Sequence, residues 1–206
     1  MRISLPGTPP GARPREVIEW VKPGVPPGDP TRSGGGGISW ATLASDLPSS
    51  LGIRRATLRD IPLLVRHRRA MWEGIHPFPK ALLDRGDRSY RRWLLRGLKT
   101  RRILGYLASS NRGGPVGSVT VWFRESEPTP GVNHVTAPFL STAFVEPAYR
   151  RRGRFSAMVR QAVRECRSRG HAFVTGVPVG HARRGLRRLG FRSLGEMGLV
   201  LREVLR

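Results

Sequence analysis

The residues best suited to chemistry form a basic turn between a predicted strand and a predicted helix. Residues 150–155 read Arg-Arg-Arg-Gly-Arg-Phe, after the apolar Phe144 and Val145 and before an amphipathic run. Unpaired N–H groups in the first turn of a helix, together with the positive end of its dipole, bind anions. Glycine lets a backbone approach its ligand, and arginines add charge and paired donors. The turn predicts a phosphate-binding site, although the same features also occur on solvated basic surfaces.

The helix that follows the turn has a clear buried face. Residues 153–169 place apolar side chains at helical spacing, opposite Arg160, Arg164 and Arg167. This spacing predicts an amphipathic helix that packs one face on a core, and Gly170 is suited to end it. The apolar stripe consists of Phe155, Met158, Val159, Ala162, Val163 and Cys166.

Strands and helices alternate over residues 51–206. Asp60 and Pro62 predict the start of a first helix, and Gly86 predicts a break in a second helix at about 80–98. The expected strands are 53–58, 103–109, 116–125, a strand that ends at Val145, 172–176, 192–194 and 197–204, and the last helix covers 182–189. The order β-α-α-β-β-β-α-β-α-β-β predicts an α/β fold: a central, mostly antiparallel, mixed sheet of six to seven strands with helices on both faces.

Residues 1–50 differ in composition from the rest. They contain Pro-Pro at 9–10 and 26–27 and four glycines at 34–37, and they cannot bury enough apolar surface to offset chain entropy. We expect a mostly disordered arm, followed by one domain over 51–206. A short helix around 15–21 could be a docking peptide, a linker, or part of a stretch translated from a wrongly chosen start codon.

The strand end and the basic turn match a known family pattern, V-x-P-x-[YF]-[RQ]-x-x-G-x-[GA], without a gap. The matching residues are Val145, Pro147, Tyr149, Arg150 and Gly153. On these residues the region resembles the GNAT (GCN-five-related N-acetyltransferase) superfamily. Residues 53–60 resemble the first strand and helix start of that family, and residues 189–191, Leu-Gly-Phe, resemble a late motif. The resemblance implies a GNAT-like fold and acetyl-CoA as co-substrate.

The resemblance also implies which residues bind the cofactor. Main-chain groups of Ala143, Phe144 and Val145 would bind the pantetheine arm. The pyrophosphate would lie on the turn and the first helical residues, which are Arg150, Arg151, Arg152, Gly153, Arg154, Phe155 and Ser156. The implied reaction is the transfer of an acetyl group from acetyl-CoA to a primary amine by direct attack.

Two positions depart from the family. Phe155 replaces the usual glycine or alanine, and its ring must turn inward, with the apolar stripe, if its amide is to face phosphate. Leu186 stands where many members have a tyrosine that protonates the departing thiolate. Another group or water must then supply that proton, or catalysis is weak, or the domain binds without turnover.

Direct attack requires a neutral amine, a donor for the developing oxyanion and a route for two protons. The candidate general bases are Glu125, at the end of the third expected strand, and His134, in the loop that follows it; Glu127 and Glu196 rank lower. Each of these side chains is also readily explained as a solvated loop residue. No covalent intermediate is needed, so Cys166 is expected to be part of the core.

Charge and composition limit the kinds of ligand and partner that the protein is expected to bind. The chain of 206 residues has a formal net charge of +23, almost all of it within residues 51–206. Such a field attracts phosphates on a cofactor or a nucleic acid, and it favours acidic or phosphorylated acceptors over polyamines. The single cysteine and the unclustered histidines predict no metal, and the absence of a long apolar run predicts a cytoplasmic protein without membrane contact. The oligomeric state stays open, a homodimer included.

A second hypothesis comes from a different class of function. The charge and Leu186 together are compatible with a basic module that associates with nucleic acid or the ribosome on a catalytically weak GNAT-like fold. Binding and turnover of acetyl-CoA distinguish the two hypotheses.

Overall fold

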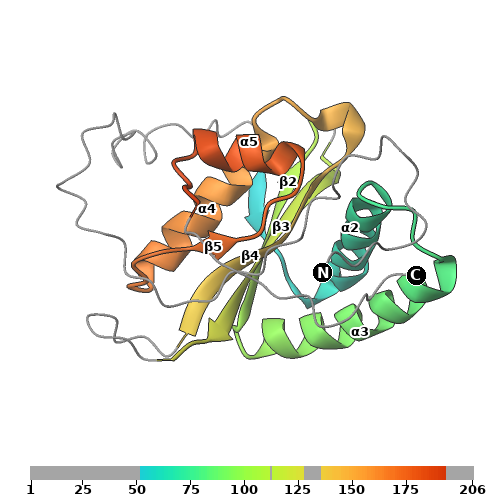
Figure 1. The fold of residues 1–206 in the computed structure, drawn as a ribbon, viewed down its shortest axis with the longest axis horizontal. Coiled ribbons are helices and arrows are strands. Elements are labelled where there is room, and N and C mark those ends of the chain that lie inside the picture. Colours follow the sequence, from blue (N-terminus) through green and yellow to red (C-terminus); the bar gives the residue numbers. More distant parts are fainter. Residues whose placement is uncertain (1–51, 112, 128–135, 194–206) are drawn as a thin grey trace, which may run out of the picture.

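The computed structural model of the protein describes residues 52–111, 113–127 and 136–193. They form one five-stranded sheet in the order β1-β2-β3-β4-β5, antiparallel except for the parallel pair β4–β5. Helices α2 and α3 cover one face, and α4 and α5 cover the other (Figure 1). The elements are β1 Ile53–Arg55, α2 Ile61–Glu73, α3 Lys80–Lys99, β2 Ile103–Ser109, β3 Pro115–Glu125, β4 Thr136–Val145, α4 Arg154–Ser168, β5 Thr175–Gly176 and α5 His181–Arg188, with short 3-10 turns at Leu58–Asp60 and Pro147–Tyr149.

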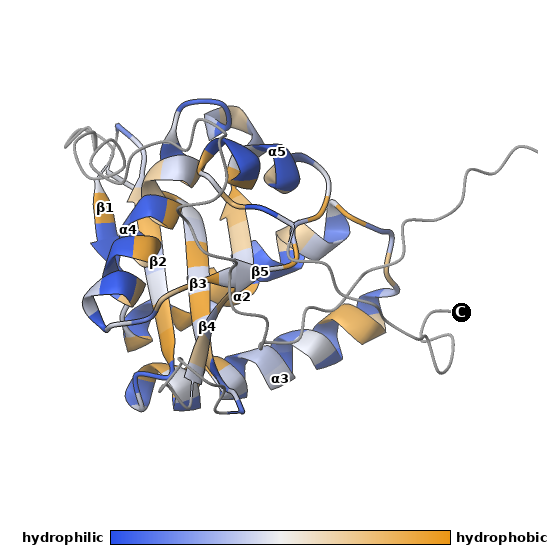
Figure 2. Cartoon of the chain, turned by 60° about the vertical axis from the view of Figure 1, so that its left-hand side comes forward, coloured by the Kyte–Doolittle hydropathy of each residue, from blue (hydrophilic) through white to orange (hydrophobic). Residues whose placement is uncertain are grey.

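The core on the α4 face contains the predicted stripe of that helix. Met158 and Ala162 are fully buried there against Val119 and Val121 of β3. In Figure 2 the strands are mostly hydrophobic in colour, whereas the helices show hydrophobic and hydrophilic residues side by side. The helical spacing of the sequence therefore predicted correctly which face of α4 is buried.

A second core fills the space between the sheet and helices α2 and α3. Leu64 of α2 and Leu94 of α3 pack there with Ile103 and Leu107 of β2. The alternate β2 residue Leu104 joins the α4 core instead. Because successive side chains of a strand point to opposite faces, β2 contributes to both cores, and this explains why all but its last residue are buried.

The start of α2 is stabilised by local hydrogen bonds. Asp60 stands at the predicted N-cap position, but its carboxylate turns back and accepts hydrogen bonds from Arg54 (2.7 and 2.9 Å) and from the Thr57 amide (2.8 Å). These contacts, the Arg54 bond above all, hold the pKa of Asp60 well below its usual range. They fix the end of β1 to the start of α2.

Several helix and strand boundaries predicted from the sequence differ from those in the structure. Helix α3 runs without a break through Gly86, because tertiary packing of the helix outweighs the low helix propensity of a single glycine. The strand expected at 172–176 is reduced to Thr175–Gly176. The expected strand 197–204 and the arm at 1–50 lie outside the described residues, as does Leu194 of the strand expected at 192–194. Within the described part, the sheet therefore has five strands.

No helix of the described residues is long and apolar enough to cross a membrane. In the same part of the chain, no group of three His, Cys, Asp or Glu side chains is placed to hold a metal ion. Cys166 is buried in the α4 core, and burial raises the pKa of its thiol to about 12.

Candidate functional site

Strand β4 contains a bulge that groups four hydroxyls. Thr120 pairs with Thr142 and the next residue, Val121, pairs with Leu140, so Ser141 is an extra residue in β4. The hydroxyl oxygens of Thr120 and Ser141 are 2.8 Å apart, and those of Tyr90 and Thr142 are 3.4 Å apart. We call these four residues, Tyr90, Thr120, Ser141 and Thr142, the hydroxyl cluster. It lies on the α2/α3 side of the sheet, and two of its members, Ser141 and Thr142, are at the bulge itself.

Strand β4 also has an open edge beyond the bulge. It pairs with β5 only at Phe139 and Leu140, after which the two strands separate. The Glu146 amide donates to the Val116 carbonyl (2.9 Å), which fixes the phase of the antiparallel ladder. Backbone groups of alternate residues then point the same way: those of Phe144 point toward β3, whereas those of Ala143 and Val145 point away from it. We call this side of residues 141–145 the open edge.

The basic turn follows the open edge directly. Arg150 donates from Nε to the Val145 carbonyl at 2.9 Å, which folds the turn back onto the strand. Gly153 has φ +78°, in the left-handed region that favours glycine, and immediately precedes α4. The first backbone bond of α4 runs from the Ala157 amide to the Gly153 carbonyl (2.9 Å). The amides of residues 154–156 therefore precede the hydrogen-bond ladder of the helix and are available to an anion.

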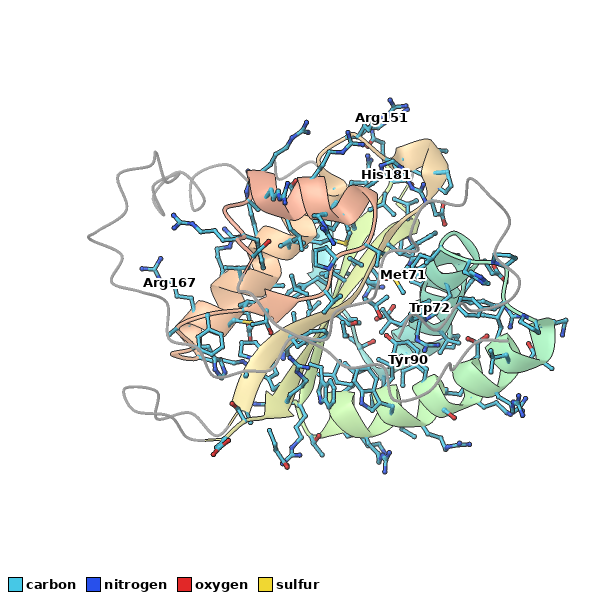
Figure 3. All side chains as sticks on the ribbon, viewed as in Figure 1. Met71, Trp72, Tyr90, Arg151, Arg167 and His181 are labelled. Carbon is cyan, nitrogen blue, oxygen red and sulfur yellow. The ribbon has the colours of Figure 1, made fainter. Side chains whose placement is uncertain are left out.

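The arginines of the turn differ in what they offer. Arg151 and Arg152 are exposed, and Figure 3 shows Arg151 projecting outward at this end of the molecule. Arg154, in contrast, is buried, and its guanidinium donates to the Ser109 carbonyl and to Oδ1 of Asn111, both at 3.2 Å. Its side chain thus ties the turn to the β2–β3 connection, and Arg154 offers a ligand its backbone amide only.

Phe155 turns away from the turn, toward α5. A Cβ on Gly185 would lie 2.8 Å from Cε1 of the Phe155 ring, so the ring packs closely against this glycine. The bulk of Phe155 is therefore accommodated by a glycine on the facing helix, and its amide stays on the side of the turn. The next residue of α5, Leu186, is buried in the α4 core with Leu189 and supplies no proton donor.

His67 lies on the opposite side of β4 from α4. Its Nδ1 is hydrogen-bonded to the Ser118 hydroxyl (2.9 Å), and its ring is 5.0 Å from that of Phe144. Burial lowers the pKa of His67 to about 4, so the imidazole is neutral near pH 7. Phe144 accordingly contributes its ring to packing on α2.

The structure does not bring every predicted site residue together. Glu125 pairs with Thr136 at the far end of β4, five strand residues or roughly 16 Å from Ser141, and it forms an exposed ion pair with Arg102 (2.8 Å). Glu127 is exposed beyond it. His134 and Glu196 lie outside the described residues. The residues that are gathered are those of β4, the turn and the first turn of α4.

Residues 53–193 match the sequence model of the acetyltransferase (GNAT) domain. The chain belongs to the GNAT family of acetyltransferases. No curated protein matches it. Among solved structures, the fold is similar to a GCN5-related N-acetyltransferase from Ralstonia eutropha, with 24% identity, a TM-score of 0.67, and coverage of 73% of this chain and 98% of that one.

Two further solved structures have the same fold. A predicted acetyltransferase from Clostridium acetobutylicum, solved with acetyl-CoA, has 22% identity and a TM-score of 0.64 over 73% of this chain and 95% of its own. An aminoglycoside 6'-N-acetyltransferase from Acinetobacter baumannii has 15% identity and a TM-score of 0.56 over 75% and 99%. In this GNAT domain, then, the open edge and the basic turn are the features to which a function can be assigned.

Proposed function

We propose that the protein transfers an acetyl group from acetyl-CoA to a primary amine by direct attack. One observation carries the proposal: the open edge of β4 leads without interruption into a turn of free amides and exposed arginines. A ligand that fits such a surface is an extended chain with amide groups and a terminal pyrophosphate. Its amides can pair with the unpaired backbone groups of the strand, and its pyrophosphate can accept hydrogen bonds from the amides at the helix start.

The cofactor contacts follow from the backbone directions. Ala143 and Val145 point their main-chain groups toward the pantetheine arm, with the Val145 carbonyl shared with Arg150. The pyrophosphate lies on the amides around Gly153 and of residues 154–156, and Arg151 and Arg152 supply charge. The main-chain contact expected for Phe144 is not part of this assignment, because its backbone groups belong to the β3–β4 ladder and its ring packs on α2.

The acceptor amine approaches from the α2/α3 side, where the hydroxyl cluster lies. Its nitrogen forms a bond to the thioester carbon, the carbon–sulfur bond breaks, and one proton leaves the nitrogen while the thiolate takes up another. The Ala143 amide, directed away from β3 just past the bulge, donates to the oxygen that becomes negative. Ser141 is the partly exposed member of the hydroxyl cluster and can pass the amine proton to water. With Leu186 buried, water also protonates the thiolate.

Calorimetric titration with acetyl-CoA, followed by an amine screen that detects CoA release, tests the proposal. We expect micromolar to submillimolar binding and amine-dependent thioester loss. Absence of binding at millimolar acetyl-CoA would refute it.

The second hypothesis, a basic nucleic-acid-associated module, is supported by one observation. The Phe155–Gly185 contact joins α5 to the turn, and α5 presents four exposed arginines, Arg183, Arg184, Arg187 and Arg188. Binding of acetyl-CoA without thioester loss across the amine screen, together with salt-sensitive retention of tRNA, would favour this module. Turnover without retention would exclude it.

A further inference from the structure

Arg68 holds an unusual place on helix α2. It lies seven residues after Ile61 and four after Leu64, within the apolar stripe that packs α2 on the sheet. Its guanidinium carbon is 4.6 Å from the centre of the Tyr90 ring and 5.7 Å from that of Trp72. Gly86 of α3 leaves room beside Nη1. A cation is thus held between two helices by aromatic rings at a position where the helix pattern calls for an apolar residue.

This cation makes no direct ion pair among the described residues. Among the described residues, no carboxylate lies within ion-pair distance of Arg68, and none accepts a hydrogen bond from its guanidinium. The neighbouring Arg69, by contrast, contacts Asp84 and Asp87 at 2.7 Å and Glu73 at 3.1 Å. The acidic groups between α2 and α3 thus make their direct ion pairs with Arg69 and, for Asp84, also with Lys80 (2.9 Å), while Oδ1 of Asp87 has no hydrogen-bond partner among the described residues.

Burial lowers the pKa of Arg68, and electrostatic interactions with Tyr90 and the Asp87 carboxylate only partly oppose this effect. None of the guanidinium nitrogens of Arg68 is among the buried, unpartnered atoms of the described residues, so its N–H groups stay accessible to a ligand although the side chain is half-buried. One turn further along α2, the indole N–H of Trp72 is buried with no acceptor among the described residues. Two side chains one turn apart on α2 thus have donors that an anion would satisfy.

The place of Arg68 relative to the site is fixed by Tyr90. One face of the Tyr90 ring lies against the guanidinium, and the hydroxyl of the same ring meets Thr142 at the bulge (3.4 Å). Arg68 is therefore separated from the start of the open edge by one aromatic ring. Figure 3 shows Met71, Trp72 and Tyr90 together on the side of β4 that faces α2 and α3.

We propose that Arg68 binds a carboxylate of the acceptor, so that the substrate is a small amine that also carries a carboxylate. This inference rests on the proposed acetyl transfer. A planar guanidinium with parallel N–H groups matches a carboxylate, and the amine at the other end of the molecule then reaches the bulge. A polycationic acceptor such as an aminoglycoside would bring ammonium groups against Arg68 and is disfavoured.

Matched pairs of acceptors test the inference. Glycine, β-alanine and 4-aminobutyrate are each compared with their primary amides, which lack the carboxylate, and kcat/KM is referred to the neutral amine because the amine pKa differs between acid and amide. For the best pair we expect kcat/KM to favour the acid by roughly 10- to 100-fold, the range for a charge-assisted hydrogen bond. In Arg68→Gln this ratio falls to near one, and Arg68→Lys, which keeps charge but loses the planar fork, is intermediate. Arg66→Gln, the same charge change at an exposed position of α2, keeps the wild-type ratio.

The acid-to-amide ratio is measured within one protein sample, so a partly unfolded variant does not alter it. Equal turnover of acids and amides by the wild type would overturn the inference while leaving acetyl transfer intact. If acetyl-CoA binds but no member of the panel is acetylated, titration of the CoA complex with the N-acetyl acids and N-acetyl amides decides, and lack of preference for the acids overturns the inference. Failure to bind acetyl-CoA refutes the proposed function itself.

Discussion

The contact between Phe155 and Gly185 predicts that one substitution changes sign with its background. Glycine in a helix interior is about 1 kcal/mol less favourable than alanine, so Gly185→Ala would ordinarily stabilise α5. The new methyl group would lie 2.8 Å from Cε1 and 3.2 Å from Cδ1 of the Phe155 ring, and such overpacking costs about 1–3 kcal/mol. In the wild type we therefore expect Gly185→Ala to lower the free energy of unfolding by up to about 2 kcal/mol.

In Phe155→Ala the ring is gone and the methyl group has room, so the same substitution should raise the free energy of unfolding by about 1 kcal/mol. Denaturant unfolding of the four proteins measures the coupling, which we expect to be about 1–3 kcal/mol. Gly86→Ala is the matched control, because its methyl group meets Nη1 of Arg68 at an ordinary 3.5 Å and should stabilise in either background. If Gly185→Ala stabilises both backgrounds equally, the ring does not pack on α5, and the account of how Phe155 fits the turn is wrong.

Three further outcomes are expected. Gly153→Glu forces a side chain onto φ +78° and sets a negative charge at the basic turn, so the acetyl-CoA Kd measured by calorimetry should rise at least about 30-fold; unchanged affinity would mean that the pyrophosphate binds elsewhere. The unfolded chain protonates His67 below pH 6.5 and the folded chain only near pH 4, so the free energy of unfolding should fall by up to about 3 kcal/mol as pH drops through that window; His67→Gln should flatten this slope and exposed His76→Gln should not. Glu125→Gln should change kcat/KM by less than about twofold, since Glu125 pairs with Thr136, roughly 16 Å along β4 from Ser141, and a tenfold loss would restore Glu125 as the general base.

Residues close together in the sequence were predicted well. The apolar stripe of α4 repeats at helical spacing, and the strand 103–109 and the hairpin that follows it carry their own turn signals, so local patterns were sufficient. The basic turn was found for the same reason, because strand end, glycine and helix start are consecutive. The inward turn expected of the Phe155 ring is what the structure has.

Features that depend on pairing between distant segments could not be predicted. The bulge at Ser141 appears only when β3 and β4 are set in register, since nothing in the strand itself marks an extra residue. His67 stands between two arginines and reads as a surface residue, yet it is buried on Ser118 of β3. One signal was present in the sequence: Arg68 stands at an apolar position of the helical repeat.

The open edge of β4 has a consequence for handling the protein. Strand groups left without a partner invite pairing with another chain, which makes an exposed edge a site of aggregation. In the proposed complex the pantetheine arm covers this edge, much as an added strand would. A ligand present at 100 times its Kd stabilises the folded state by about 2.7 kcal/mol. We therefore expect the protein to stay soluble to higher concentrations when it is purified and stored with CoA. CoA, a product of the proposed reaction, would then also stabilise the folded state.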